Sequence, residues 1–428
     1  MKEKGNVAFK EGRYQEALEL FSEGIALDSS NFLLWSNRSA TYLKLGEFGK
    51  ALKDANTVIS LNPQFAKGYI RKGNTFLSLK SWKEAAHCFE DGLKIEPENK
   101  ELIKGREIAL FSLQCSNVIK DGIWVPVPIA YSTEKPFPIR WDLVDQFVDF
   151  YVNNGVTGLY CVSNAAEYSK LTEEECIQFT KQVMSRVQGK QVQVVSGAKE
   201  SDNLQTYAKN VKDIYDTGVS SVVLSLASFA KPHEPETTLL ANIKTFLSYL
   251  DPAIPIGITE AGATCRQASL YLLEEMHNLK RIYYLVENSG SVVMTEKKFK
   301  VFKDQMSGFK IFCANPTNFS NCIEFGGNGF FGDIGSFIPA ILVWVWKNHA
   351  VQKEVSNGVF LFLSLSEPTV QWLFPTNLKI FLKLHEPSLR GLEAVTRMEL
   401  PPAQREELVA RVSHLHDAVS YIQTIIKS

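Results

Sequence analysis

The sequence lacks the features that mark membrane, nucleic-acid-binding and disulfide-rich proteins. Its 46 basic residues are matched by 47 acidic ones, so no positive excess points to nucleic acid or an anionic membrane as the main partner. The longest apolar run, residues 337–346, is about half of the ~20 residues that a membrane span needs. Seven scattered cysteines, an odd number without a Cys-x-x-Cys pair, exclude a disulfide framework and a zinc site. The start of the chain carries no apolar signal core, so we expect a cytoplasmic protein without a metal or another cofactor.

The first hundred residues repeat with a period of 34. Three sets of residues show this spacing: Ala17, Ala51 and Ala85; Tyr14, Phe48 and Trp82; Leu27, Leu61 and Ile95. A 34-residue period with small residues at fixed points is typical of stacked helix–turn–helix units, which leave a concave groove for an extended peptide. The pattern resembles three copies of the tetratricopeptide repeat, followed by a more polar capping helix over residues 98–114.

Polar residues recur on the predicted groove face of these repeats. They resemble the dicarboxylate clamp of cochaperones of the heat-shock organising type, whose pattern is Lys-x-x-x-Asn, then Asn, then Lys-x-x-x-Arg. All five positions are filled here, by Lys2, Asn6, Asn37, Lys67 and Arg71. Residues four apart lie on one helix face, and each 34-residue step returns to the same face, so the five side chains are predicted to converge. The resemblance implies binding of a chaperone's C-terminal Glu-Glu-Val-Asp tail.

The alternative is that each clamp residue is an ordinary surface side chain. That interpretation fits any one of them alone, but five at matching positions favour the clamp. Lys2 is the weakest member because it lies at a terminus that can fray. We expect the neighbouring Arg38 and Lys72 to face solvent.

From residue 117 onward, apolar runs alternate with amphipathic segments. The chain of 428 residues is therefore expected to form two domains, 1–116 and 117–428. Eight runs read as strands: 122–129, 158–163, 191–198, 221–227, 254–260, 282–287, 309–315 and 329–335. Thr172 and Glu175 form a capping box at the start of one intervening helix. Eight strand–helix units predict a parallel eightfold (β/α)8 barrel, with extra C-terminal helices from about Ala350. The alternative, an open doubly wound sheet, lacks a glycine-rich phosphate fingerprint.

The order of segments in the second domain resembles the dihydrodipicolinate synthase and N-acetylneuraminate lyase superfamily. The matching segments are NNGVTGLYCVSNAAEYSKLTEEE, IPIGITEAG, YYLVENSGS, FGGNGFFGDIGSFIP and TRMELPPAQREELVARV. The resemblance covers about the whole second domain. It depends on the order of these segments rather than on any single match. It implies a barrel of the class I aldolase type, which usually associates into dimers or tetramers.

The catalytic residues typical of that superfamily are missing from this sequence. Its enzymes form a Schiff base between pyruvate and a lysine on the sixth strand, where this chain has Val286. Phe229 occupies the position of the tyrosine that moves protons. In the loop 162–167, at most Ser163 or Asn164 remains to hold a substrate carboxylate, and the arginine expected after the fifth strand is absent unless Arg266 replaces it. The losses predict a pseudoenzyme.

Residual activity would need an amine from elsewhere. Lys199 and Lys231 follow strands and are candidates, whereas Lys280 and Lys310 precede strands and are expected at the wrong end. Glu167 and Glu260 read either as an acid/base pair or as buried partners of backbone or hydroxyl groups. The residual ligand pocket is thus predicted from Ser163, Asn164, Glu167, Phe229, Glu260 and Val286.

Three functions remain open at this point. The first is a chaperone-binding adaptor whose barrel is a scaffold. The second is an adaptor whose inactive barrel senses a keto acid or sugar acid. The third is an active lyase or aldolase with an altered nucleophile. A homo-oligomer formed through the barrel would display several clamps and raise the effective concentration of sites.

Overall fold

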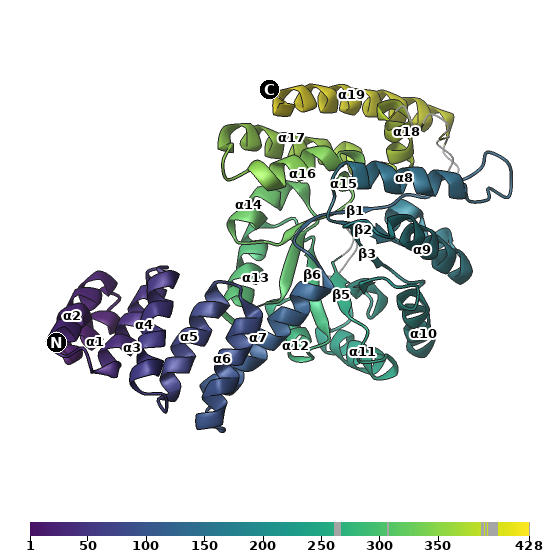
Figure 1. The fold of residues 1–428 in the computed structure, drawn as a ribbon. Helices are drawn as coiled ribbons and strands as arrows, with labels where there is room; N and C mark the ends of the chain where they lie inside the picture. The colour runs from purple at the N-terminus through teal and green to yellow at the C-terminus, as the bar shows by residue number, and fades with distance from the viewer. Residues whose placement is uncertain (261–266, 306–307, 387–388, 390–391, 393–400, 428) are drawn as a thin grey trace. The chain divides into compact units, whose positions relative to one another are not determined.

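The computed structural model divides the chain into two compact units, residues 1–116 and 117–428 (Figure 1). It describes residues 1–260, 267–305, 308–386, 389, 392 and 401–427.

The first unit is a row of helices in which consecutive helices pack as pairs. Its helices are α1 (Lys2–Lys10), α2 (Tyr14–Leu27), α3 (Phe32–Lys44), α4 (Phe48–Leu61), α5 (Ala66–Ser78), α6 (Trp82–Ile95) and α7 (Lys100–Val118). The first helices of successive repeats also touch, α1 with α3 and α3 with α5. Three helix pairs followed by α7 confirm the predicted repeat fold.

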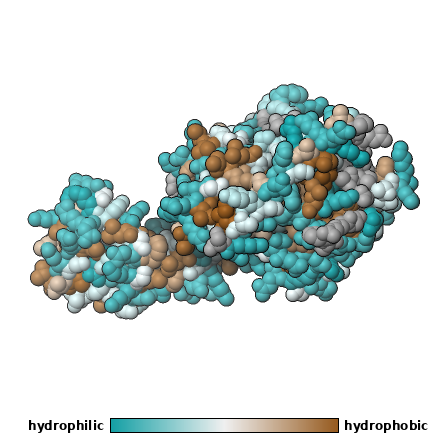
Figure 2. Space-filling view, turned by 90° about the horizontal axis from the view of Figure 1, so that it is seen from above, coloured by the Kyte–Doolittle hydropathy of each residue, from teal (hydrophilic) through white to brown (hydrophobic). Residues whose placement is uncertain are grey.

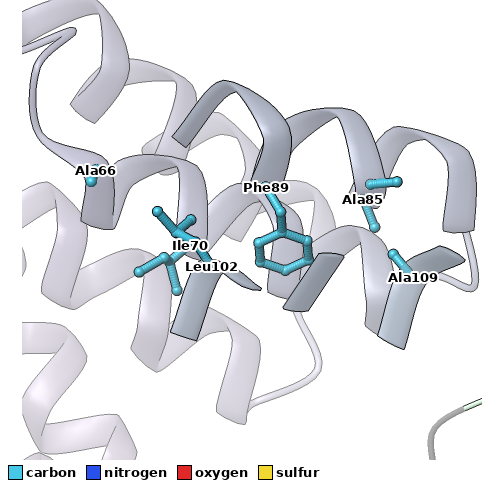
Figure 3. Packing of buried hydrophobic residues seen from close by; sticks show 7 residues of the cluster. Ala66, Ile70, Ala85, Phe89, Leu102 and Ala109 are labelled. Carbon is cyan, nitrogen blue, oxygen red and sulfur yellow. The ribbon is translucent and has the colours of Figure 1, made fainter. Parts of the chain in front are cut away.

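Small residues let these helices approach closely. The periodic alanines Ala17, Ala51 and Ala85 are fully buried. A Cβ on Gly73 would come within 2.6 Å of the Phe89 ring, so only glycine fits there. Around Phe89 lie side chains from α5, α6 and α7 (Figure 3). The third repeat therefore buries its core partly against the capping helix.

Arg38 does not face solvent, so that expectation was wrong. Its guanidinium binds the buried Asp54 carboxylate through Nε at 2.7 Å and through a second nitrogen at 3.0 Å. It also lies 4.7 Å from the centre of the Trp35 ring. Because Asp54 belongs to α4, this bidentate pair fixes α3 against α4.

The second unit is a closed parallel barrel of eight strands. They run in chain order around the barrel: β1 (Gly122–Pro126), β2 (Gly158–Cys161), β3 (Gln193–Ser196), β4 (Ser221–Ser225), β5 (Ile256–Thr259), β6 (Ile282–Glu287), β7 (Lys310–Cys313) and β8 (Gly329–Phe331). Each lies within one of the eight predicted runs. The barrel is confirmed, and the alternative of an open sheet was wrong.

Helices separate the strands and cover the outside of the barrel (Figure 1). They are α8 (Trp141–Asn153), α9 (Glu173–Val187), α10 (Leu204–Tyr215), α11 (Glu236–Tyr249), α12 (Leu270–Asn278), α13 (Val292–Gln305) and α14 (Phe319–Glu324). Thr172 and Glu175 cap α9 reciprocally, as the sequence predicted. The extra C-terminal helices are α15 (Ile334–Phe337), α16 (Pro339–Asn348), α17 (Lys353–Gln371), α18 (Thr376–His385) and α19 (Pro402–Lys427).

Aromatic rings fill the barrel interior because glycines on neighbouring strands make room for them. A Cβ on Gly158 would lie 2.2 Å from the Trp124 ring, and one on Gly257 would lie 2.1 Å from the Tyr284 ring. The Tyr284 hydroxyl is paired with the Ser221 hydroxyl at 2.8 Å. The interior is thus a packed core rather than a pore.

The molecular surface carries both hydrophobic and hydrophilic areas. On the face drawn in Figure 2, brown hydrophobic areas are interspersed among hydrophilic residues. Within the described ranges, no helix combines the length and the hydropathy needed to cross a membrane.

Candidate functional site

The predicted clamp residues lie on α1, α3 and α5, the helices that begin the three repeats. Asn37 of α3 donates a hydrogen bond from Nδ2 to Oδ1 of Asn6 on α1, at 2.8 Å. Both side chains are half-buried. The structure therefore brings together two clamp residues that are 31 positions apart in the sequence.

Lys67 and Arg71 lie one turn apart on α5, which packs against α3. Lys67 is exposed and Arg71 is half-buried. The Arg71 Nε is buried and, within the described part of the chain, has no hydrogen-bond partner. Burial lowers the pKa of Arg71, and the Glu101 carboxylate only partly opposes this effect. Such an uncompensated cation is suited to accept an anionic ligand.

Lys2 begins α1, and its ammonium lies 3.7 Å from the exposed Glu3 carboxylate. No contact of Lys2 with another clamp residue is among the interactions of the described residues. Its part in the clamp rests on its position on α1, one helical turn before Asn6.

The second unit holds a cavity of about 390 Å³ at the carboxyl ends of the barrel strands. Every strand or its following residue contributes to the wall: Pro126, Val162, Gly197, Ser225, Thr259, Val286, Ala314 and Phe331. This end of a barrel is where such folds place their ligands. Of the six residues suggested for a residual ligand pocket, Ser163, Asn164 and Val286 line the cavity, whereas Glu167, Phe229 and Glu260 are absent from its lining.

No lysine is among the described residues that line the cavity. Lys199 instead donates to the carbonyl oxygen of Ser169 at 3.0 Å, and Lys231 is exposed in its loop. Lys310 begins β7 at the opposite end of the barrel, where it pairs with Asp121 at 2.7 Å. Arg266, the other suggested replacement, lies outside the described residues.

Phe229 is buried among aromatic rings rather than at the cavity. Its ring centre lies 5.9 Å from that of Tyr207 and 5.2 Å from that of Phe246 on α11. The expectation that Phe229 faces a ligand is therefore wrong, because its side chain packs into the helical layer.

Glu260 is a partner of a buried lysine, which sequence reasoning missed. Lys298 of α13 places its ammonium 2.7 Å from each Glu260 oxygen and 3.3 Å from a Glu287 oxygen. All three side chains are buried. Glu260 also accepts hydrogen bonds from the backbone N–H of Ala268 at 2.7 Å and of Asn288 at 3.3 Å, so it is a buried partner of backbone groups, as the second interpretation of the sequence had it.

Glu167 has a similar partner in Lys379 of α18. The Glu167 carboxylate and the Lys379 ammonium are 2.6 Å apart, and Lys379 lies 4.7 Å from the centre of the Tyr131 ring. Glu167 adopts a left-handed backbone conformation, with φ of 51°, between two short 3-10 helices. Lys298 and Lys379 both lie in phase with the apolar residues of their helices. This phase was the only sign in the sequence that the two lysines are buried.

Two further carboxyl groups lie beside the cavity. Asp333, which follows β8, lines it together with Gln371 of α17. The Gln371 amide donates to Glu367 at 3.0 Å and is also the hydrogen-bond partner of Asp333. Burial raises the pKa of Asp333 to about 6 and that of Glu367 to about 7, and the Asp333 charge contributes to the raised pKa of Glu367.

We expect this pair to make the barrel less stable as the pH rises. A carboxyl group with a raised pKa in the folded state binds its proton more tightly there, so the stabilisation present below pH 4 is lost between about pH 4 and 7. At pH 8 the double variant Asp333→Asn/Glu367→Gln should be more stable than the wild type by at least about 2 kcal/mol, since one pKa unit corresponds to about 1.4 kcal/mol. Urea unfolding at pH 5 and pH 8 measures the gap, which should shrink at the lower pH.

Asp149→Asn is the matched control for that experiment. The pKa of Asp149 is lowered, first by its hydrogen bond from Arg186, so its removal should reduce stability at pH 8. A double variant that is no more stable than the wild type at pH 8 would contradict the assignment of the cavity pair.

Among the residues whose placement is described, no group of three or more His, Cys, Asp or Glu is arranged to hold a metal ion.

Two family models match the beginning of the chain. One, described as TPR repeat, matches residues 5–46, and the other, described as tetratricopeptide repeat, matches residues 34–65. Together with the helix pairs, these matches show that the N-terminal unit consists of tetratricopeptide repeats.

Curated proteins share these repeats. The "Hsp70-Hsp90 organising protein" of Plasmodium falciparum is 43% identical over 122 residues, which are 28% of this chain and 47% of that protein. The "Hsp70-Hsp90 organizing protein" of Triticum aestivum is 41% identical over 104 residues, 24% of this chain and 18% of that protein. The chain spans less than half the length of these relatives, so the relationship concerns the repeats alone.

Solved structures match the second unit. A monomeric dihydrodipicolinate synthase variant covers 71% of this chain and 99% of its own, with 18% identity and a TM-score of 0.62. The dihydrodipicolinate synthase of Thermotoga maritima gives 17% identity and a TM-score of 0.62 over 71% of this chain and 99% of that one. At this level of identity the likeness shows a common barrel fold.

Proposed function

We propose that the repeat unit binds the C-terminal Glu-Glu-Val-Asp tail of heat-shock chaperones and that the protein is a chaperone adaptor. The observation that carries the proposal is the contact of Asn6 with Asn37, together with the buried Arg71 Nε that has no acceptor in the described chain. The names of the repeat-sharing relatives, which refer to Hsp70 and Hsp90, support the same partner class.

A C-terminal aspartate matches the donors of this groove. It offers two carboxylates, one from the side chain and one from the chain end. Asn6 and Asn37 supply amide donors, whereas Lys67 and Arg71 supply charged donors, whose hydrogen bonds to carboxylates are roughly twice as strong as neutral ones. The asparagine pair fixes the α1 and α3 side chains in position, so less side-chain entropy is lost on binding.

Titration of the full chain with a short peptide ending in Glu-Glu-Val-Asp tests the proposal. The free-acid peptide should bind, and the same peptide with an amidated C-terminus should bind at least about 10-fold more weakly because one carboxylate is gone. Absence of binding, or equal binding of both peptides, would remove the tail as the ligand.

For the barrel we propose a binding or scaffolding role without Schiff-base catalysis. Val286 lines the cavity at the position where the resemblance places the lysine, and a hydrocarbon side chain has no nucleophile. The buried lysines Lys298 and Lys379 are each held by carboxylates. A lyase acting on a keto acid through a substitute amine finds no supporting contact among the described residues.

A further inference from the structure

The charged side chains among the described residues of the barrel cavity are opposite in sign to what an acidic ligand requires. Two carboxylates, Asp333 and Glu200, line it. The described lining includes no lysine, arginine or histidine. Glu200 lies at the exposed rim, where it accepts a hydrogen bond from Ser228 at 2.6 Å. A keto acid would bring a further negative charge to a wall whose described residues offer no cation to pair with it.

Aromatic rings form much of the remaining wall. Tyr160, Tyr168, Tyr207 and Phe331 all line the cavity. Tyr160 and Phe331 meet edge to face with their ring centres 5.1 Å apart. Ring faces attract cations through their quadrupole, and the attraction grows when the site is shielded from water.

One buried hydroxyl in the cavity has no partner. Ser163 is 4% exposed, and its Oγ makes no hydrogen bond within the described structure. It lines the cavity beside Asn164 and Tyr168. A buried polar atom of this kind is costly unless something satisfies it, so the site is built to receive a group that forms hydrogen bonds.

We propose that the cavity binds a small organic cation, a protonated or quaternary amine. Asp333 supplies the opposite charge, the Tyr160 and Phe331 rings surround the cationic group, and the Ser163 hydroxyl accepts from an N–H or donates to a ligand oxygen. The volume of about 390 Å³ lies within the range of small-ligand sites. This ligand class replaces the keto acid or sugar acid expected from the sequence. The proposal concerns the barrel alone and does not depend on tail binding.

The experiment is a calorimetric titration of the full chain at pH 8, where both Asp333 and Glu367 are ionised. The probes are choline, 1,4-diaminobutane, glucose and pyruvate. At least one of the two amines should bind, whereas glucose and pyruvate should bind at least about 10-fold more weakly, since they lack the cation. The variants Asp333→Asn and Ser163→Ala should each weaken amine binding, the first by about 10-fold or more.

Glu354→Gln is the matched control, because Glu354 is an exposed carboxylate of α17 outside the cavity lining. It should bind the amine like the wild type. The Asp333→Asn variant should retain tail binding, which separates a failure of this proposal from a failure of the clamp. Tighter binding of pyruvate than of both amines would overturn the inference. So would amine binding that neither cavity variant weakens, or no binding by either amine.

Discussion

Replacing Lys67 and Arg71 together with alanine should lower the affinity for the Glu-Glu-Val-Asp peptide by on the order of 100-fold or more. Each side chain is expected to donate a charge-assisted hydrogen bond worth about 1.5–3 kcal/mol, and about 1.4 kcal/mol corresponds to a factor of ten. Both residues lie on one face of α5, and the Arg71 Nε has no acceptor in the described structure. Fluorescence anisotropy with a labelled peptide measures the loss.

The control for this prediction removes the same charge from another surface. Lys53 and Lys83 are exposed residues of α4 and α6, the second helices of their repeats. The Lys53→Ala/Lys83→Ala variant should keep the peptide affinity within about 3-fold, because exposed charges outside the groove act only through screened long-range attraction. Equal losses in the two double variants would show a general charge effect and contradict the clamp.

Replacing Lys298 with methionine should destabilise the barrel by about 3–5 kcal/mol, since removal of one partner leaves buried charges uncompensated. Lys298 is the common partner of Glu260 and Glu287, and all three are buried. Without the ammonium, two carboxylates would face each other in the helical layer of α13. Urea unfolding of the full chain, followed by tryptophan fluorescence, measures the change.

The neighbouring residue provides the control for this variant. Lys297 is exposed on the same helix, and Lys297→Met should change stability by less than about 0.5 kcal/mol. Adding Glu260→Gln and Glu287→Gln to Lys298→Met should restore part of the lost stability, because the buried negative charges are then removed. If Lys298→Met is as stable as Lys297→Met, the ion triad does not hold α13 to the barrel.

The architecture could be predicted because its signals are local or periodic. The 34-residue spacing of Ala17, Ala51 and Ala85 determines the helix pairs, and eight apolar runs separated by amphipathic segments determine the barrel. The pairing of Asn6 with Asn37 agrees with the predicted convergence of the first two repeats.

The ion pairs could not be predicted because their partners are far apart in the sequence. Glu167 and Lys379 are 212 positions apart, and only the closed barrel with its C-terminal helices brings them together. For the same reason Gln371, which connects Asp333 with Glu367, was missed. Phe229 was misjudged because its position in a motif does not reveal the direction of its side chain, which packs against Phe246.

The most direct test of the claim that this chain binds rather than condenses its ligand is borohydride trapping with pyruvate. The intact protein is incubated with pyruvate and sodium borohydride and then weighed by mass spectrometry, with a pyruvate-condensing aldolase treated in parallel as a positive control. We predict an unchanged mass, because Val286 occupies the cavity wall and no described lining residue carries an amine. A stable adduct of one reduced pyruvate on a single lysine of the barrel would contradict the account.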